Sequence, residues 1–515
     1  MIKKNYKSKV LVTILAVFSI LFNQYYGYVG ILPIDSFLIF NSGYDLMNGY
    51  YPFKDYWTIK EPFIDLLQAI FFKIFGVSWF SYVFHASVFN CIIAVSTFFI
   101  LKKFELKTNL CFLYSFCVSI LFYPTAGTPF SDHHTLIFCI LSIYTFILAL
   151  KFKKNFYWFL IPIFLGFSVM SKQAPTIYVI LLITFVSLVH FFKTKNFSGL
   201  IFASLGSITV ISFFIILFLI ADINLKDFFY QYYFYPKSLG GTRFDWLFPF
   251  EFQRIFWRYK IQYISISILI YIFIKFTFTK KNINFLDYII SLTLILFCLL
   301  TIMHQLMTIN AIFIYCLIPI FCAFSNIYGL KYLNSKKITS NFLIVLTLCS
   351  TVYYFVNYVN NRTFMDLRGI DLNNSVNGKL IHPELSNIKW LTMFYPKNPE
   401  QEVSKIKLAI DVLKKDDERK MIITDYQFIS VFLGQYDYSV TRFWYDFHGY
   451  PSENNKYFDY WKDFVLSKIN DNNIKNIYVL KPLHGEKKPL ENILKNCYEK
   501  KEFSKDFYKL NLTNC

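Results

Sequence analysis

Long runs of apolar residues recur along this chain and limit what it can fold into. The runs are roughly 17 to 25 residues long and alternate with short polar breaks, and a helix of that length crosses about 30 Å of hydrocarbon. Of the 515 residues, 55% are hydrophobic and 17% are charged, and the mean hydropathy of +0.41 lies outside the range of soluble proteins. Because only helices and closed barrels satisfy their backbone hydrogen bonds in lipid, each run is predicted to be a membrane-spanning helix.

The length rule predicts about eleven spans. A basic N-terminus leads directly into the first run, which lacks the small-residue cleavage site of a signal peptide, so we expect this run to be retained. The predicted spans cover residues 10–29, 78–101, 109–123, 133–150, 156–171, 175–192, 198–220, 261–279, 285–303, 305–328 and 341–359.

Lysine residues mark every second connection between these spans, whereas the connections 123–131 and 303–305 contain neither Lys nor Arg. Basic loops stay in the cytoplasm, so the N-terminus is predicted to be cytoplasmic. An odd number of spans then places the residues from about 361 onward on the other side. The lysines are Lys102, Lys103, Lys107, Lys151, Lys153, Lys154, Lys193, Lys195, Lys275, Lys280, Lys281, Lys331, Lys336 and Lys337.

The same distribution explains the net charge of +19 without a nucleic-acid partner. A nucleic-acid-binding protein gathers its cations on one face or arm, among stacking aromatic residues. Here the lysines lie in short clusters between apolar runs. We therefore expect membrane lipid, and no nucleic acid, as a partner.

Residues 1–360 are predicted to form the multi-spanning domain. Two of its non-cytoplasmic loops, residues 31–77 and 221–260, are long, so function is expected on that side. In the first loop, residues 35–49 predict an N-capped amphipathic helix lying in the membrane interface, and residues 62–76 repeat this pattern.

The tail, residues 361–515, mixes helical and strand patterns. Helices are predicted over 402–415 and 456–469, and strands over 421–424 and 476–480. The predicted fold class is therefore an all-α polytopic membrane protein with a small C-terminal α/β domain outside the cytoplasm.

Eight of the ten cysteines fall in apolar runs without the paired spacing of zinc or redox sites. They are interpreted as packing residues. Cys497 and Cys515 lie in the polar tail, where they form a disulfide if the compartment is oxidising and are otherwise two unpaired thiols.

Acidic residues in the first long loop are the first candidates for chemistry. Asp35 follows the first span closely, so its carboxylate should lie at the membrane surface, where it could act as a general base; alternatively, it only caps the interfacial helix. Asp55 and Glu61 form a second acidic group, for which a solvated loop is the alternative.

Charged residues also flank later spans. Asp132 and His133, in Ser131-Asp132-His133-His134, lie just before the fourth span, where a metal-binding role and a helix cap are both open. Lys172 is the cation of a short non-cytoplasmic turn and is suited to binding a phosphate, with snorkelling as the alternative. Arg243 lies in the second long loop among aromatic residues, which by default form an interface belt.

The order of these features resembles the GT-C membrane glycosyltransferases. The nearest branch contains the protein O-mannosyltransferases, the aminoarabinose transferases and the rhizobial lipopolysaccharide sugar transferases, and is similar to glycosyltransferase family 39. The similarity is best over residues 30–176 and recurs over 303–324. It is carried by Asp35 after the first span, Glu61-Pro62-Phe63 leading into an apolar helix that ends at Gly76, Ser131-Asp132, and Gly166 to Lys172-Gln173.

The resemblance implies transfer of a hexose or pentose from a polyprenyl-phosphate donor to a glycolipid, polysaccharide or protein acceptor, at the outer face of a bacterial cytoplasmic membrane. It implies that Asp35 is the catalytic base, that Asp132 is a supporting catalytic residue and that Lys172 binds the donor phosphate. The implied substrate-binding residues also include Asp55, Glu61, His133, Arg243 and His304. Ser36 stands where an acidic pair is frequent in the family, which leaves a divalent metal open.

Two other functions fit a polytopic chain. A transporter or flippase for a lipid-linked saccharide would place ionisable groups and broken helices near the bilayer midplane, whereas the polar groups here gather at one face. A structural factor of envelope polysaccharide assembly would need no site, so substitution of Asp35 would leave its function unchanged.

Overall fold

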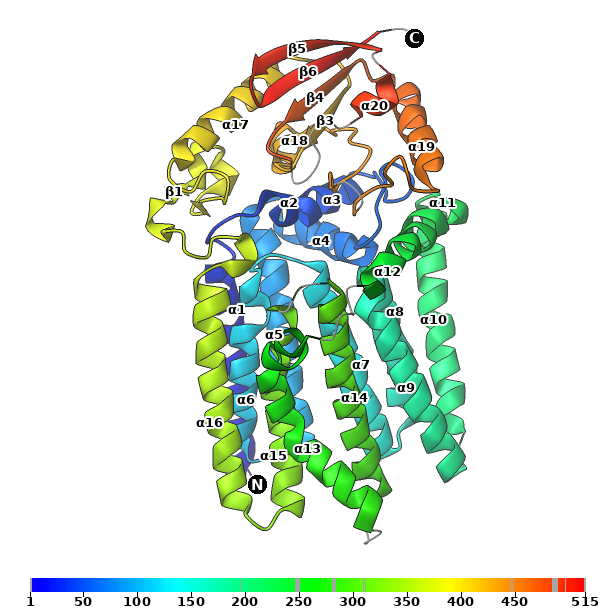
Figure 1. The fold of residues 1–515 in the computed structure, drawn as a ribbon, viewed down its shortest axis with the longest axis vertical. Coiled ribbons are helices and arrows are strands. Elements are labelled where there is room, and N and C mark those ends of the chain that lie inside the picture. Colours follow the sequence, from blue (N-terminus) through cyan, green and yellow to red (C-terminus); the bar gives the residue numbers. More distant parts are fainter. Residues whose placement is uncertain are drawn as a thin grey trace. The chain divides into compact units, whose positions relative to one another are not determined.

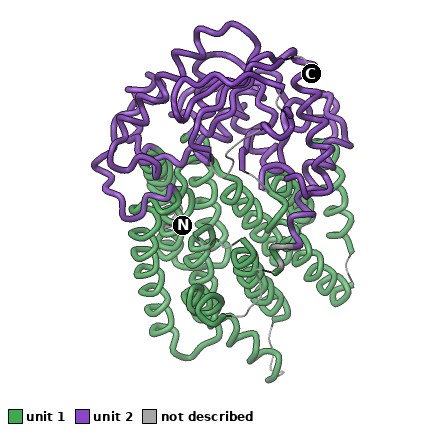
Figure 2. The backbone as a smooth tube through the Cα atoms, turned by 45° about the horizontal axis from the view of Figure 1, so that its top comes forward, with its two compact units in different colours: residues 1–27, 83–214, 242–364 green, residues 28–82, 215–241, 365–515 purple. Residues whose placement is uncertain are grey.

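A computed structural model describes residues 2–195, 197–245, 251–279, 284–308, 310, 312–445, 448–483, 490–495 and 497–513. The chain divides into two compact units, which Figure 2 distinguishes by colour. Unit 1 comprises residues 1–27, 83–214 and 242–364, and unit 2 comprises residues 28–82, 215–241 and 365–515.

Long apolar helices make up most of unit 1 (Figure 1). In the described part of the chain, ten helical segments are long and apolar enough to cross a membrane, and the 17-residue apolar helix α8 adds a shorter one. They match the predicted apolar runs, so the prediction of a polytopic helical membrane protein is confirmed. The helices are α1 (Ile2–Tyr26), α5 (Trp79–Lys103), α6 (Thr108–Leu121), α7 (Ser131–Phe152), α8 (Asn155–Ser171), α9 (Gln173–Thr194), α10 (Ser198–Ile220), α13 (Lys260–Thr279), α14 (Phe285–Thr308), α15 (Leu317–Tyr332) and α16 (Lys336–Tyr354).

The predicted connection at residues 303–305 is wrong, because α14 continues without a break to Thr308. The polar residues His304 and Gln305 suggested a loop in the sequence. In the structure both side chains are buried, at 3% exposure each, and therefore face protein rather than lipid. Polar groups of this kind are tolerated in a membrane helix when they point into the bundle.

Several lysine-containing connections gather at one end of unit 1. The Lys151 ammonium, at the end of α7, donates a hydrogen bond to the Lys103 carbonyl oxygen at the end of α5 (2.7 Å). Lys331 of α15 pairs with Asp287 of α14 (2.5 Å). A cavity of about 500 Å³ is lined by the α5–α6 connection and by these ends of α7, α14 and α15, as the Lys alternation predicts. Lys280 and Lys281 lie outside the described residues.

The chain also contains many shorter helical elements. They are α2 (Pro33–Ser36), α3 (Leu38–Met47), α4 (Pro62–Phe75), η1 (Tyr123–Thr125), α11 (Leu225–Phe229), η2 (Tyr230–Phe234), α12 (Tyr235–Asp245), η3 (Gln253–Trp257), η4 (Ile312–Ile314), η5 (Phe355–Asn360), η6 (Thr363–Met365), η7 (Leu372–Asn374), η8 (Gly378–Leu380) and η9 (Pro383–Leu385).

The predicted single helix over residues 35–49 is two helices, α2 and α3. Asp35 lies in the first turn of α2, one turn after the N-cap residue Leu32, so the capping role considered for Asp35 is wrong. The reason is Pro33, whose fixed φ and missing N–H suit the first position of a helix. The helix therefore begins before Asp35. The helix predicted over residues 62–76 is confirmed as α4, which ends at the cap residue Gly76.

The tail folds as α/β structure, as predicted. Strands β3 (Lys420–Thr424) and β4 (Asn476–Leu480) are parallel, and the four-stranded sheet has the order β3-β4-β6-β5, with β4, β6 and β5 antiparallel. Both parallel strands are buried throughout, as expected for strands covered on two faces. The other elements are β5 (Tyr498–Ser504), β6 (Phe507–Leu512), the short pair β1 (Val376–Asn377) and β2 (Lys389–Trp390), and helices α17 (Pro399–Lys414), α18 (Phe428–Leu433), α19 (Phe458–Asp471) and α20 (Glu491–Leu494).

The first long loop packs into the core of the tail, which explains why both fall in unit 2. Trp57 is 1% exposed and contacts the ring of Trp461, and its backbone N–H donates to the Val440 carbonyl oxygen (2.8 Å). Cys497, also in unit 2, is disulfide-bonded. Its predicted partner Cys515 lies outside the described residues.

A buried arginine also joins the loop to the tail. The guanidinium of Arg442 lies 2.5 Å from Asp437 and pairs with Asp45 of α3, and the three side chains are at most 3% exposed. Arg442 also stacks over the ring of Tyr56, 4.5 Å from its centroid. A buried carboxylate is stable in its charged form only with such a partner.

We therefore predict that Arg442→Met lowers the free energy of unfolding by about 3–5 kcal/mol, because it leaves Asp45 and Asp437 buried without a cation. Thermal unfolding of the full-length protein in detergent measures this loss. The matched control is Lys475→Met, which removes an exposed pair with Glu418 (57% and 56% exposed) and should cost about 0–1 kcal/mol. Equal losses in the two variants would contradict the assignment.

Candidate functional site

An ion pair joins two of the predicted site residues in unit 1. The Lys172 ammonium donates to both carboxylate oxygens of Asp132, at 2.8 and 2.7 Å. The side chains are 19% and 9% exposed, respectively. The pairing brings together residues forty positions apart and gives Lys172 a specific partner, which snorkelling would not require.

Local backbone geometry places both residues at helix ends. Asp132 lies in the first turn of α7, after the extended N-cap residue Phe130, and is not itself the cap. Lys172 is the single extended residue between α8 and α9, with φ −165° and ψ 136°. The sharp break between these two helices directs the lysine side chain toward the start of α7.

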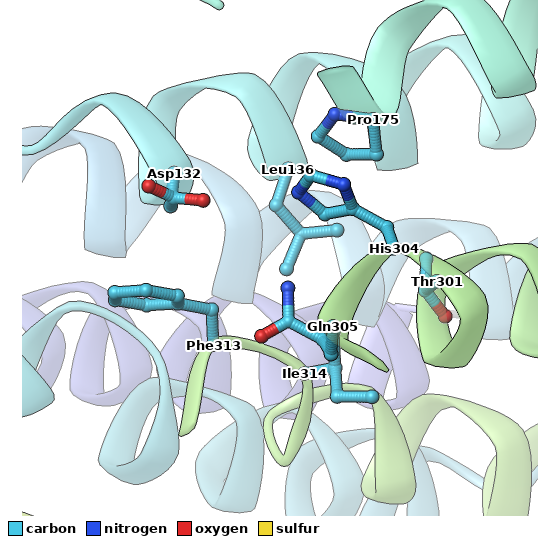
Figure 3. A pocket seen from close by; sticks show the side chains of 8 residues that line it. All are labelled: Asp132, Leu136, Pro175, Thr301, His304, Gln305, Phe313 and Ile314. Carbon is cyan, nitrogen blue, oxygen red and sulfur yellow. The ribbon is translucent and has the colours of Figure 1, made fainter. Parts of the chain in front are cut away.

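A small pocket with both polar and apolar walls lies beside this pair (Figure 3). Asp132 contributes to its wall, and the neighbouring residues His304 and Gln305 of α14 contribute a ring nitrogen, Nε2, and an amide oxygen, Oε1, that are buried without a hydrogen-bond partner. The free volume is about 10 Å³. The pocket is lined by Asp132, Leu136, Pro175, Thr301, His304, Gln305, Phe313 and Ile314.

Arg243 is a further charged residue near the pocket. It interacts electrostatically with His304 and with Tyr178 of α9, and His304 interacts in the same way with Lys172 and Asp132. Four of the predicted site residues, Asp132, Lys172, Arg243 and His304, therefore lie close together in unit 1. The sequence did not single out Gln305, although a glutamine next to a histidine in an otherwise apolar helix was a visible signal.

The histidines after Asp132 bind protein groups instead of lining the pocket. His133 Nε2 donates to the Phe122 carbonyl oxygen (3.2 Å), and its ring stacks on Tyr123. His134 hydrogen-bonds to His85 (3.0 Å between Nε2 atoms) and to the Tyr123 hydroxyl. No group of three or more His, Cys, Asp or Glu side chains that could hold a metal occurs among the described residues.

The remaining predicted residues belong to unit 2. Asp35 is half-buried in α2. Asp55 accepts a hydrogen bond from the backbone N–H of Tyr51 (2.7 Å), which stabilises a turn. Glu61 is 2% exposed and pairs with Lys60 at 3.1 Å. Glu61 thus lies in a buried ion pair and not in the solvated loop that was the alternative.

An arginine that the sequence analysis did not single out holds the segment that precedes Asp132. The Arg362 side chain is fully buried and donates to the carbonyl oxygens of Pro124 (2.8 Å), Thr125 (3.3 Å) and Ala126 (3.0 Å). Two residues later, Phe364 contacts the ring of Phe130 (4.9 Å between centroids). Residues 362–364 therefore fix the backbone from Pro124 to the start of α7.

These features define a multi-pass membrane protein with a charged pocket at one end of its helices. Residues 60–219 match the family model described as dolichyl-phosphate-mannose-protein mannosyltransferase. This match, which includes Asp132 and Lys172, confirms the resemblance to GT-C glycosyltransferases of the family 39 type and indicates a membrane glycosyltransferase. No curated protein matches the chain.

The Arg362 contacts lead to a prediction about this segment. Arg362→Met should leave three carbonyl groups unsatisfied, at about 1–3 kcal/mol for each group that stays buried. Amide hydrogen exchange at Ala126 and Gly127, whose N–H groups bond to the Tyr123 carbonyl oxygen, should become faster. Hydrogen exchange with mass spectrometry on the full-length protein measures the change.

The control for this variant is Arg254→Met. Arg254 is half-buried and its side chain donates to the carbonyl oxygen of Leu306 (2.8 Å), which lies in α14. This substitution should not alter exchange at Ala126 and Gly127. Unchanged exchange in Arg362→Met would show that Arg362 does not hold the segment.

Proposed function

We propose that this protein transfers a sugar from a polyprenyl-phosphate donor to a hydroxyl group of a glycolipid, polysaccharide or protein acceptor at the outer face of the bacterial cytoplasmic membrane. The observation that carries the proposal is the pairing of Lys172 with Asp132, two residues of the segment that matches the mannosyltransferase family, beside a small pocket. A membrane-embedded site suits a donor whose carrier has a long apolar tail.

The reaction has simple requirements. The acceptor oxygen bonds to the anomeric carbon while the bond from that carbon to the phosphate oxygen breaks, and the electron pair leaves with the phosphate. Glycosidases need a second carboxylic acid to protonate the leaving oxygen, but a phosphate leaves as a stable anion. One general base and fixed cations are therefore sufficient, and attack opposite the phosphate inverts the anomeric centre.

Each proposed role uses a charge that suits it. Lys172 and Arg243 are the cations near the pocket, and we assign the donor phosphate to Lys172. Asp132 holds the lysine side chain in place through two hydrogen bonds. The role of Asp35 as the base that accepts the hydroxyl proton comes from the resemblance, since Asp35 lies in unit 2 and the pocket lies in unit 1.

The phosphate assignment predicts that Lys172→Met weakens binding of undecaprenyl phosphate in nanodiscs by roughly 10- to 100-fold. A hydrogen bond to a charged group contributes about 1.5–3 kcal/mol, which corresponds to that range. Lys172→Arg should retain part of the affinity. The control is Lys193→Met, an exposed lysine in the last turn of α9, which should bind like the wild type. Equal affinities of Lys172→Met and the control would refute the assignment.

The base assignment makes a separate prediction. Asp35→Asn should reduce transfer by about 10²–10⁴-fold, because the amide cannot accept the proton, while donor binding and membrane insertion stay normal. Transfer is measured as acceptor-dependent loss of donor, with a panel of polyprenyl-phosphate sugars and an envelope extract that supplies acceptors.

Asp222→Asn is the control for Asp35→Asn, because Asp222 is also in unit 2 and its side chain is 91% exposed. Normal transfer by Asp35→Asn would exclude Asp35 as the base. If the wild type consumes no donor and instead moves the lipid across the bilayer, the protein is a flippase and the transferase proposal fails.

A further inference from the structure

We infer that His304 and Gln305 form a subsite for a single hydroxyl group of the donor sugar. This inference rests on the proposed function and names a feature of its substrate. The subsite is the pocket beside Asp132, and its two polar ends are the orphaned ring nitrogen of His304 and the orphaned amide oxygen of Gln305.

Burial makes these two unpaired atoms significant. Both side chains are 3% exposed, and both lie on the pocket wall. A buried polar atom without a partner costs about 1–3 kcal/mol, so folded proteins keep few of them without a reason. The two atoms belong to consecutive residues of one helix, and both side chains line one cavity (Figure 3), which points to one shared ligand group.

The chemistry of the two atoms defines that group. With the proton of the neutral imidazole assigned to Nε2, this nitrogen donates a hydrogen bond, and the amide oxygen of Gln305 accepts one. A hydroxyl group does both at once, because it has one O–H donor and two lone pairs. A carbonyl or ether oxygen would satisfy the histidine alone, and an ammonium group would satisfy the glutamine alone.

The size of the pocket sets the second limit. Its free volume of about 10 Å³ corresponds to one water-sized group. Leu136, Pro175, Phe313 and Ile314 form apolar walls around this space. A hydroxyl fits in place of a water molecule, whereas an acetamido group at the same ring position would collide with these walls.

The position of the pocket connects the hydroxyl to the phosphate. Asp132 lies on the pocket wall and binds Lys172, the residue to which the donor phosphate is assigned. His304 interacts electrostatically with both. A sugar linked to a phosphate at Lys172 therefore has its ring beside the pocket, where one ring hydroxyl can enter.

The experiment compares two affinities in nanodiscs that contain the full-length protein. One is for undecaprenyl phosphate without sugar, and the other is for undecaprenyl phosphate that carries mannose, glucose or galactose. The sugar that binds most tightly is then presented as a series of monodeoxy analogues. We expect one analogue to bind about tenfold more weakly to the wild type, as the loss of a buried hydrogen bond implies.

The key variant is Gln305→Met, which keeps the size of the side chain and removes the amide. It should bind the intact sugar donor about tenfold more weakly, become insensitive to that one deoxy analogue, and bind undecaprenyl phosphate unchanged. The matched control is Gln262→Met, because Gln262 is another buried glutamine with an orphaned amide, on α13, that does not line the pocket. It should bind like the wild type.

The outcomes separate the inference from the proposed function. If no monodeoxy analogue binds more weakly, only a water molecule occupies the pocket and the subsite is overturned. The subsite is also overturned if Gln305→Met binds the sugar donor as tightly as Gln262→Met does. In both cases, binding of undecaprenyl phosphate by the wild type still supports the transferase proposal. If the wild type does not bind undecaprenyl phosphate, the proposed function and the inference both fail. Should Gln305→Met not fold, His304→Phe tests the other half of the pair through the same deoxy analogue.

Discussion

The ion pair between Lys172 and Asp132 is the interaction on which the candidate site depends. A charge that is largely buried is costly unless a partner neutralises it, and the side chains of Lys172 and Asp132 are only 19% and 9% exposed. Here Lys172 and Asp132 neutralise each other through two hydrogen bonds of 2.7 and 2.8 Å. The pair joins the start of α7 to the break between α8 and α9, so the positions of these helix ends and of the pocket wall are coupled.

The position of Asp132 depends in turn on the segment that leads into α7. Arg362 binds three successive carbonyl groups of this segment, and Gly127 approaches Gly27 so closely that a Cβ on Gly127 would lie 2.7 Å from the Gly27 Cα. Gly127 also has a positive φ of 81°, which side-chain-bearing residues rarely adopt. The ends of α1 and of the last span thereby fix the backbone that carries the site.

The sequence predicted the elements with strong patterns and missed the contacts between distant residues. Apolar run length was enough for the spans, and the strands β3 and β4 stood out as short apolar segments between polar ones. The false break at 303–305 arose because a polar pair in an apolar helix resembles a loop until its burial is known. Arg442 and Arg362 could not be assigned, because Asp45 and the carbonyl groups of residues 124–126, to which they bind, lie hundreds of positions away.

The candidate site was partly predictable, because single residues with a clear pattern can be found in the sequence but contacts between distant residues cannot. Asp132 and Lys172 each interrupt an apolar pattern, so both were visible, and the alternation of lysines placed them at one face. Their pairing and the pocket beside them required the helices to be packed. Asp35 was visible too, but its position in the first turn of α2 depends on Pro33.

The charges near the pocket suit the proposed reaction, in which negative charge increases on the phosphate. Asp132, Lys172 and Arg243 together carry one excess positive charge, which matches the single negative charge of a sugar phosphodiester. Cleavage of the sugar–phosphate bond converts this diester into a phosphate monoester, which carries nearly two negative charges at neutral pH. The attraction to Lys172 and Arg243 is therefore stronger as the bond breaks than before, and only interactions that strengthen in this way accelerate the chemical step. A hydroxyl pocket beside the same pair would hold the sugar ring still while the charge moves to the phosphate.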